Sequence, residues 1–237
     1  MEAGFGSDAL AQVLRELRIP YIALTPGASF RGLHDSLVNF LGNERPQMLL
    51  CIHEENAVSL AHGYARVTNE PLAVALHANV GLMHATMAIF NAWCDRIPIL
   101  MVGGVGPIDA VKRRPWVDWI HTSRDLASII RDYIKWDDVP GSVLAALESI
   151  VRAHRIAMTH PRGPTYVALD AGIQEEALTG PVPMPPLDRF PLAHPASPSP
   201  QALREATALL EGARAVGMSA IHFRDAESAL RELNQML

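Results

Sequence analysis

The sequence is poor in cysteine and has no excess of positive charge, and both shortages exclude classes of protein. Cys51 and Cys94 are its only cysteines, which excludes a disulfide framework and predicts two buried thiols in a reducing compartment. Lysine and arginine number 20 against 25 aspartates and glutamates, so we expect neither nucleic acid nor an anionic membrane as partner. No secretory signal is visible at the N-terminus, and the longest apolar stretch, residues 97–106, is too short to span a bilayer. These absences predict a soluble, cytoplasmic protein.

A regular alternation of apolar runs and helical patterns fills the first 170 residues. The apolar runs predict strands at residues 21–24, 47–52, 71–76, 97–102 and 165–169. The helical patterns lie at residues 8–17, 30–41, 54–67, 82–93, 124–134 and 142–159. Continuous apolar strands between helices indicate βα units around a parallel sheet that is buried on both faces. The ligand of such a sheet is expected at the carboxyl ends of the strands.

The composition changes after this region. Residues 179–200 contain eight prolines, which predicts an extended linker behind a domain of residues 1–178. Beyond it, helical patterns lie at residues 200–213 and 227–236. Because about 40 residues are too few for a second core, we expect residues 201–237 to be a docking tail or the truncated beginning of a middle domain.

The most informative segment runs from Cys51 to Arg66, where a strand ends and Glu54 opens a helix. After its first turn this helix has almost no charge before Arg66, which predicts burial on several sides, including against another subunit or domain. Gly63 costs the helix roughly 1 kcal/mol relative to alanine, so close packing around it is expected. From spacing alone, Glu54 and Glu55 are equally well explained as first-turn acids stabilised by the helix dipole.

Two further strand-to-helix turns have similar chemistry. Residues 25–29 follow the first strand, and residues 75–84 contain His77 followed by a small-residue turn. Three such turns in consecutive βα units converge at one edge of a sheet, where a carboxylate and a histidine can perform proton chemistry. When His77 is taken alone, a structural role is the commoner explanation for a histidine at such an edge.

Together these segments resemble the N-terminal, pyrimidine-binding domain of thiamine-diphosphate-dependent enzymes of the acetolactate synthase, pyruvate oxidase and benzoylformate decarboxylase type. The resemblance covers roughly residues 5–175. Its motifs are the Pro26-Gly27 turn, the block from His53-Glu54 to Gly63-Tyr64-Ala65-Arg66, Asn91-Ala-Trp with Asp95 and Pro98, and residues 163–170. It implies an α/β fold with an open, mostly parallel six-stranded sheet, helices on both faces and a short C-terminal helical stub.

The resemblance also implies roles for individual residues. In the family, the glutamate matching Glu54 hydrogen-bonds N1' of the cofactor's aminopyrimidine, which lets the 4'-amino group remove the proton from thiazolium C2. His77 matches a proton-relaying histidine of benzoylformate decarboxylase-like members. The implied catalytic residues are therefore Glu54 and His77.

Cofactor contacts are implied for Glu54 and for the residues Pro26, Gly27, Asn79, Gly81 and His84. The second turn departs from the family pattern, because Asn79-Val80-Gly81 replaces Gly-Pro-Gly and His84 replaces an asparagine. Ala28 stands where a serine is frequent in the family. These departures leave the role implied for Glu54 unchanged, but they leave the identity of the substrate open.

The family binds Mg²⁺ and the diphosphate through a Gly-Asp-Gly motif followed by Asn-Asn, and neither occurs in this sequence. We therefore expect the pyrimidine half of a thiamine diphosphate site, no metal ligands in this chain, and a small 2-oxo acid that is decarboxylated or ligated. The expected partners are a second copy, a chain carrying the diphosphate-binding domain, or both. The chain is expected to be either a stand-alone subunit or a truncated enzyme.

Two other interpretations remain open. The chain could be a catalytically silent interaction or regulatory subunit that keeps the fold. A dinucleotide-binding domain is disfavoured, because the glycines at residues 103–106 lack a third glycine and precede Pro107. No Gly-x-Ser-x-Gly elbow is present, and the other histidines are scattered along the sequence, which predicts no zinc site.

Overall fold

The computed structural model describes residues 2–193, 196–218 and 231. The chain divides into two units, Met1–His194 and Pro195–Leu237. The first unit contains a parallel sheet of six strands in the order β2-β1-β3-β4-β6-β5. The strands are β1 Tyr21–Leu24, β2 Gln47–Leu50, β3 Leu72–His77, β4 Ile99–Val105, β5 Asp137–Asp138 and β6 Thr165–Asp170. The predicted α/β fold with a six-stranded sheet is confirmed.

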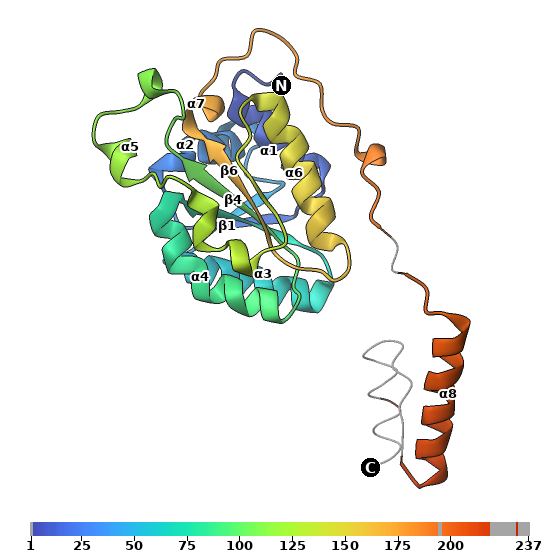
Figure 1. Ribbon diagram of the computed structural model, residues 1–237. Helices are drawn as coiled ribbons and strands as arrows, with labels where there is room; N and C mark the ends of the chain where they lie inside the picture. The colour runs from blue at the N-terminus through green and yellow to red at the C-terminus, as the bar shows by residue number, and fades with distance from the viewer. Residues whose placement is uncertain (1, 194–195, 219–230, 232–237) are drawn as a thin grey trace. The chain divides into compact units, whose positions relative to one another are not determined.

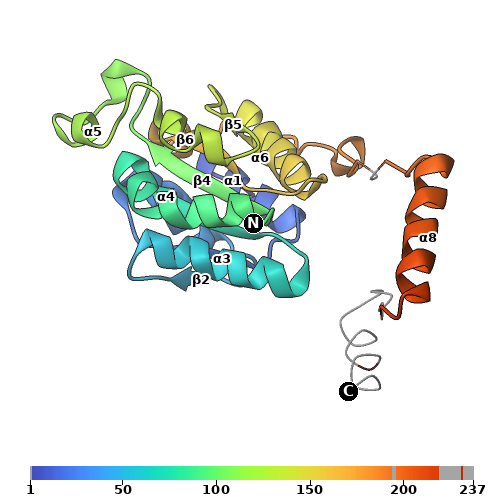
Figure 2. The ribbon, with the colours of Figure 1, turned by 60° about the horizontal axis from the view of Figure 1, so that its bottom comes forward.

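Helices cover both faces of this sheet, as Figures 1 and 2 show. They are α1 Gly6–Glu16, α2 Arg31–Asp35, α3 Glu54–Thr68, α4 Ala78–Cys94, α5 Val117–Ile120, α6 Val143–Met158 and α7 Ala171–Gln174. Helices α3 and α4 pack on one face, and α1 and α6 pack on the other. The strands are buried on both sides, because Ile22 and Leu24 contribute to one apolar cluster and Ala23 to the other. This is the reason that they read as continuous apolar runs.

The predicted helix at residues 124–134 is wrong. The structure has two short 3₁₀ turns there, Leu126–Ile129 and Arg131–Tyr133. The Arg131 guanidinium donates to the carboxylates of Asp125 and Asp137 at 2.6–3.0 Å, and these bonds fold the segment back on itself instead of extending it. Strand β5 follows directly. The sequence did not predict this strand, because its two residues are aspartates and do not form an apolar run.

Two smaller expectations are also corrected. Cys94 is exposed and Cys51 is only partly buried, because Cys94 ends α4 beyond the part that the sheet covers. Gly63 lies on the exposed side of α3, and an added Cβ there would have no atom of the described chain within 4 Å. The buried positions of α3, Ala57, Val58 and Ala61 among them, face the sheet instead.

The proline-rich segment is partly packed on the first unit. Val182, Met184, Leu187 and Phe190 lie against the apolar cluster on the α1 and α6 side. In the second unit, α8 Pro200–Ala215 has no buried residue. The helix expected at residues 227–236 lies outside the described residues, apart from Arg231. Within the described ranges, no helix combines the length and the hydropathy needed to cross a membrane.

His154, on α6, makes the stability of this fold depend on pH. It lines the same hollow as Leu17, Val151 and Phe190, and burial lowers its pKa from 6.5 to about 4. Between pH 4 and 6.5, His154 is therefore protonated in the unfolded chain and neutral in the folded chain. The free energy of unfolding should fall as the pH drops from 6.5 to 4, by at most about 2–3 kcal/mol from this residue. Urea unfolding across this range should show a smaller fall in His154→Gln, and His34→Gln should keep the fall seen in the parent. Equal pH dependence in all three proteins would contradict this assignment.

Candidate functional site

Three segments meet at the carboxyl edge of the sheet because β2, β1 and β3 are neighbours and run parallel. Residues 25–29 follow β1, His53 and Glu54 follow β2, and His77 ends β3. An added Cβ on Gly27 would lie 2.7 Å from His77, and one on Gly81 would lie 3.4 Å from the carboxylate of Glu54. The structure thus brings together the turns that the sequence placed at this edge.

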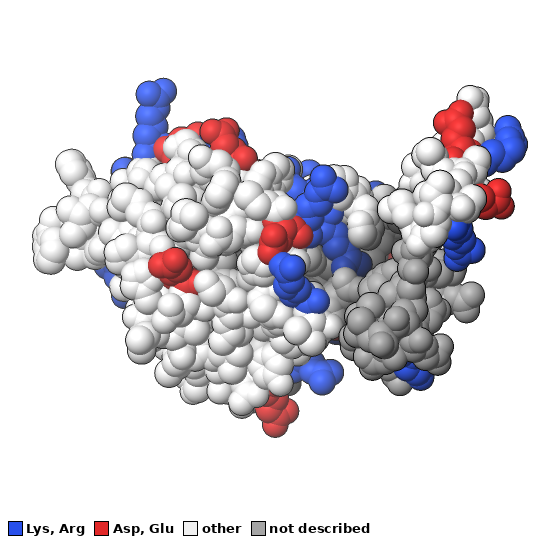
Figure 3. Space-filling model, turned by 90° about the horizontal axis from the view of Figure 1, so that it is seen from below, with Lys and Arg blue, Asp and Glu red and all other residues white. Residues whose placement is uncertain are grey.

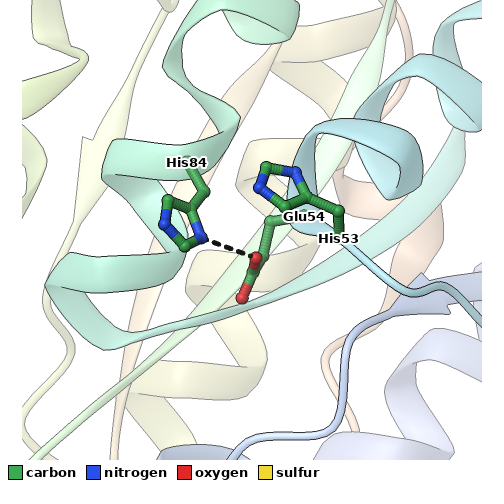
Figure 4. A group of neighbouring side chains, drawn as sticks. All are labelled: His53, Glu54 and His84. Carbon is green, nitrogen blue, oxygen red and sulfur yellow. Dashed lines mark hydrogen bonds and ion pairs between the residues drawn. The ribbon is translucent and has the colours of Figure 1, made fainter.

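Glu54 is a buried carboxylate at the first position of α3. Its side chain is 9% exposed, although water-stripped carboxylates are costly unless they are hydrogen-bonded. His84, one helix away on α4, donates from Nδ1 to Oε2 of Glu54 at 3.1 Å, as Figure 4 shows. Within the described ranges, no hydrogen bond to Oε1 is formed. One oxygen is therefore bonded to His84, and the other has no hydrogen-bond partner among the described residues.

His53 and His84 stack beside this carboxylate, with ring centroids 4.7 Å apart. Potential ligand atoms of His53, Glu54 and His84 lie within 4.8 Å of one another, so these histidines are not scattered in space as they are in sequence. His53 Nδ1 accepts the backbone N–H of Glu55 at 3.2 Å and caps α3. Since that nitrogen and Oε2 of Glu54 are already used, the group is better described as a hydrogen-bonded support for Glu54 than as a prepared metal site.

His77 ends β3 and contacts the first turn. Its Nδ1 and the hydroxyl of Ser29 form a hydrogen bond of 2.8 Å. Ser29 follows Ala28, so the contact with His77 comes from the serine one position after the expected one. Burial lowers the pKa of His77 below its usual value, and His121 lowers it further, while Glu54 raises it. His77 is therefore a neutral imidazole at neutral pH and can accept a proton.

The turn expected after His77 is instead the first turn of α4. This helix begins at Ala78, whose φ of 41° is unusual for a residue with a side chain. Asn79 consequently lies inside the helix. Its side-chain amide donates to the carbonyl of Ile120 at 3.3 Å, and thereby ties the loop between β4 and β5 to the site. Asn79 is thus placed as a loop anchor.

The same loop brings His121 against His77, with ring centroids 4.7 Å apart. His121 and Ser29 are site residues that the sequence analysis did not find. Ser29 could have been found by allowing the family's serine to shift by one residue. No sequence signal identifies His121, because its contact depends on how a long loop folds back over β3. Pro26 is exposed and follows the end of β1.

The close approach of Gly27 to His77 can be tested by substitution. Gly27 has a φ of −149°, which alanine adopts freely, so Gly27→Ala adds only the Cβ that would lie 2.7 Å from His77. We expect a loss of about 1–3 kcal/mol in the free energy of unfolding and a displaced His77 resonance in NMR spectra. Gly63→Ala is the matched control and should stabilise the chain by roughly 0.5–1 kcal/mol. An unchanged His77 resonance in Gly27→Ala would show that the contact is absent.

Comparisons with known proteins identify the family of this chain. The family described as "Thiamine pyrophosphate enzyme, N-terminal TPP binding domain" matches residues 5–129. The acetolactate synthase large subunit of Lactococcus lactis is 33% identical over 108 residues, which cover 45% of this chain and 18% of that protein. The mitochondrial acetolactate synthase catalytic subunit of Saccharomyces cerevisiae is 25% identical over 178 residues, or 75% of this chain and 25% of that protein.

A solved structure with a similar fold is the thiamine diphosphate-dependent 4-hydroxybenzoylformate decarboxylase of Rhodococcus jostii. It has a TM-score of 0.70 and 21% identity, and the match covers 88% of this chain and 37% of that one. This likeness concerns the fold. The matches to the two acetolactate synthase subunits span about a fifth to a quarter of those proteins.

Proposed function

The chain belongs to the thiamine pyrophosphate enzyme family, whose N-terminal TPP binding domain it carries at residues 5–129, and on this premise we propose that it supplies the pyrimidine half of a thiamine diphosphate site. The observation that carries the proposal is Glu54, a buried carboxylate with one oxygen bonded to His84 and the other available. We assign the binding to residues 1–178.

Other groups at the site fit an aminopyrimidine. The hydroxyl of Thr25, at the end of the first strand, is buried and has no hydrogen-bond partner among the described residues. A polar ligand would give it one, which removes a cost that buried polar atoms carry. Gly81 leaves the space beside Oε1 of Glu54 open, where any larger residue would place a Cβ at 3.4 Å.

When bound, thiamine diphosphate supplies a nucleophilic carbon that adds to the carbonyl carbon of a 2-oxo acid. Glu54 holds a proton at Oε1 toward the ring nitrogen of the aminopyrimidine. His84 fixes the carboxylate through Oε2, so Oε1 is the oxygen that faces the ligand. His77, neutral and anchored by Ser29, moves protons to and from the substrate.

The rest of the enzyme is proposed to come from elsewhere. Mg²⁺ and the diphosphate would be held by a domain whose motifs are not in this sequence, and the reaction would be decarboxylation or carboligation of a small 2-oxo acid. Glu54 and His77 fit both reactions, because each reaction needs activation of the cofactor and proton transfer at the substrate.

Binding of the pyrimidine half can be measured on the chain alone. We expect 4-amino-5-hydroxymethyl-2-methylpyrimidine, titrated at millimolar concentrations, to shift the NMR signals of His84. Glu54→Gln should weaken this binding about tenfold, because a carboxylic acid that shares its proton is replaced by a neutral amide; a hydrogen bond to a charged group accounts for roughly 1.5 kcal/mol. Glu55→Gln is the matched control, since Glu55 is exposed. Absence of binding by the parent would favour the silent-subunit interpretation.

We further propose that a second copy of the chain covers the outer face of α3 and α4. Figure 3 shows few charged side chains on this face. Its exposed apolar residues are Leu60, Met83, Met87, Phe90 and Trp93, which are 37–57% exposed. Apolar patches of this kind mark association surfaces.

Association should therefore depend on Met87. Met87→Asp places a charge at the centre of this face and should shift the chain toward a monomer in sedimentation experiments. Leu144→Asp, on α6 and 54% exposed in the parent, is the control and should leave the association state unchanged. A parent that sediments as a monomer at all concentrations would rule out this interface.

A further inference from the structure

His77, at the end of β3, is in contact with a second imidazole, that of His121. The rings are 4.7 Å apart and tilted by 45°. Asn79 anchors the loop that carries His121 through the carbonyl of Ile120 at 3.3 Å. Because the anchor is directly next to His121 in sequence, the contact between the two imidazoles is held from both β3 and the loop.

The hydrogen bonds determine which nitrogen of His121 can exchange protons. Its Nδ1 is 3.0 Å from the carbonyl of Val117. A carbonyl only accepts, so Nδ1 carries hydrogen in the neutral ring and Nε2 has the free lone pair. His77 is held through its own Nδ1, which forms a hydrogen bond with the hydroxyl of Ser29. When Nδ1–H of His77 donates to the Ser29 hydroxyl, Nε2 of His77 has a free lone pair as well, and each ring is then anchored through Nδ1 and exchanges protons at Nε2.

His77 is partly exposed, and so is His121. The residues before it, Trp119 and Ile120, are 75% and 59% exposed. Trp119 and Thr122, on either side of His121 in sequence, line an open cavity of about 670 Å³. Protons can thus reach the loop from bulk water.

We infer that His121 acts through His77, to which it passes protons that it takes up from solvent. A proton from water binds Nε2 of His121. The same nitrogen then gives it to Nε2 of His77, and His77 in turn gives a proton to the substrate. The inference rests on the proposed function for the substrate. The proton transfer between the two rings is a property of the chain alone.

The charges around His77 are consistent with this role. The titratable groups that act on it are His121 on the loop and Glu54 on α3, and His84 on α4 reaches the site through Glu54. A charge on His121 disfavours protonation of His77 at this separation, which is one reason that the pKa of His77 is lowered.

The test is NMR of the histidine rings in the chain without cofactor. His121→Asn keeps a donor for the carbonyl of Val117 but cannot titrate. We expect exchange of the His77 ring N–H with water to slow several-fold in this variant, and the midpoint of its titration to move to higher pH. Added imidazole should restore fast exchange in the variant and leave the parent unchanged. His34→Asn is the control and should behave as the parent.

A purely structural role would give the opposite result. If the loop only covers His77, removing the His121 ring opens the site, and exchange at His77 becomes faster or stays the same; either outcome overturns the inference. His121→Gln provides a second variant if His121→Asn does not fold. Glu54→Gln should keep the effect of His121 on His77 while it binds the aminopyrimidine more weakly, so failure of the proposed function and failure of this inference give different results.

Discussion

The burial of one carboxylate is the constraint on which the rest of the site depends. Glu54 lies at the start of α3, with only 9% of its side chain exposed, and a charged group in that position is tolerated only with partners. His84 provides a hydrogen bond from α4, and His53 fixes the first turn of α3 by capping it. Two helices and a strand end are therefore arranged around a single oxygen that has no hydrogen-bond partner among the described residues.

The parallel sheet explains why these partners are available. Strands β2, β1 and β3 are neighbours, so residues far apart in sequence leave the sheet at one edge. Gly27 then allows the first turn to approach His77 more closely than a residue with a side chain would permit, and Gly81 leaves space beside the Glu54 carboxylate. The parallel sheet brings the three segments to one edge, and the glycines at positions 27 and 81 leave the space in which they contact each other.

The strands and the long helices could be predicted because their apolar patterns are set by burial on two faces of the sheet. The position of Glu54 followed from the same patterns together with the family motif. Strand β5 and the turns around Arg131 could not be predicted, since ion pairs with Asp125 and Asp137 decide their shape. His121 is a similar case, because only the folded loop reveals its contact with His77.

The central claim is that Glu54 activates the aminopyrimidine of thiamine diphosphate. The most direct measurement is hydrogen–deuterium exchange at C2 of the cofactor, in a complex of this chain with a separately expressed diphosphate-binding domain of an acetolactate synthase and Mg²⁺. We expect Glu54→Gln to slow exchange by about 10²- to 10⁴-fold, while Glu55→Gln exchanges at the rate of the parent. Equal exchange rates in the parent and both variants would contradict this claim.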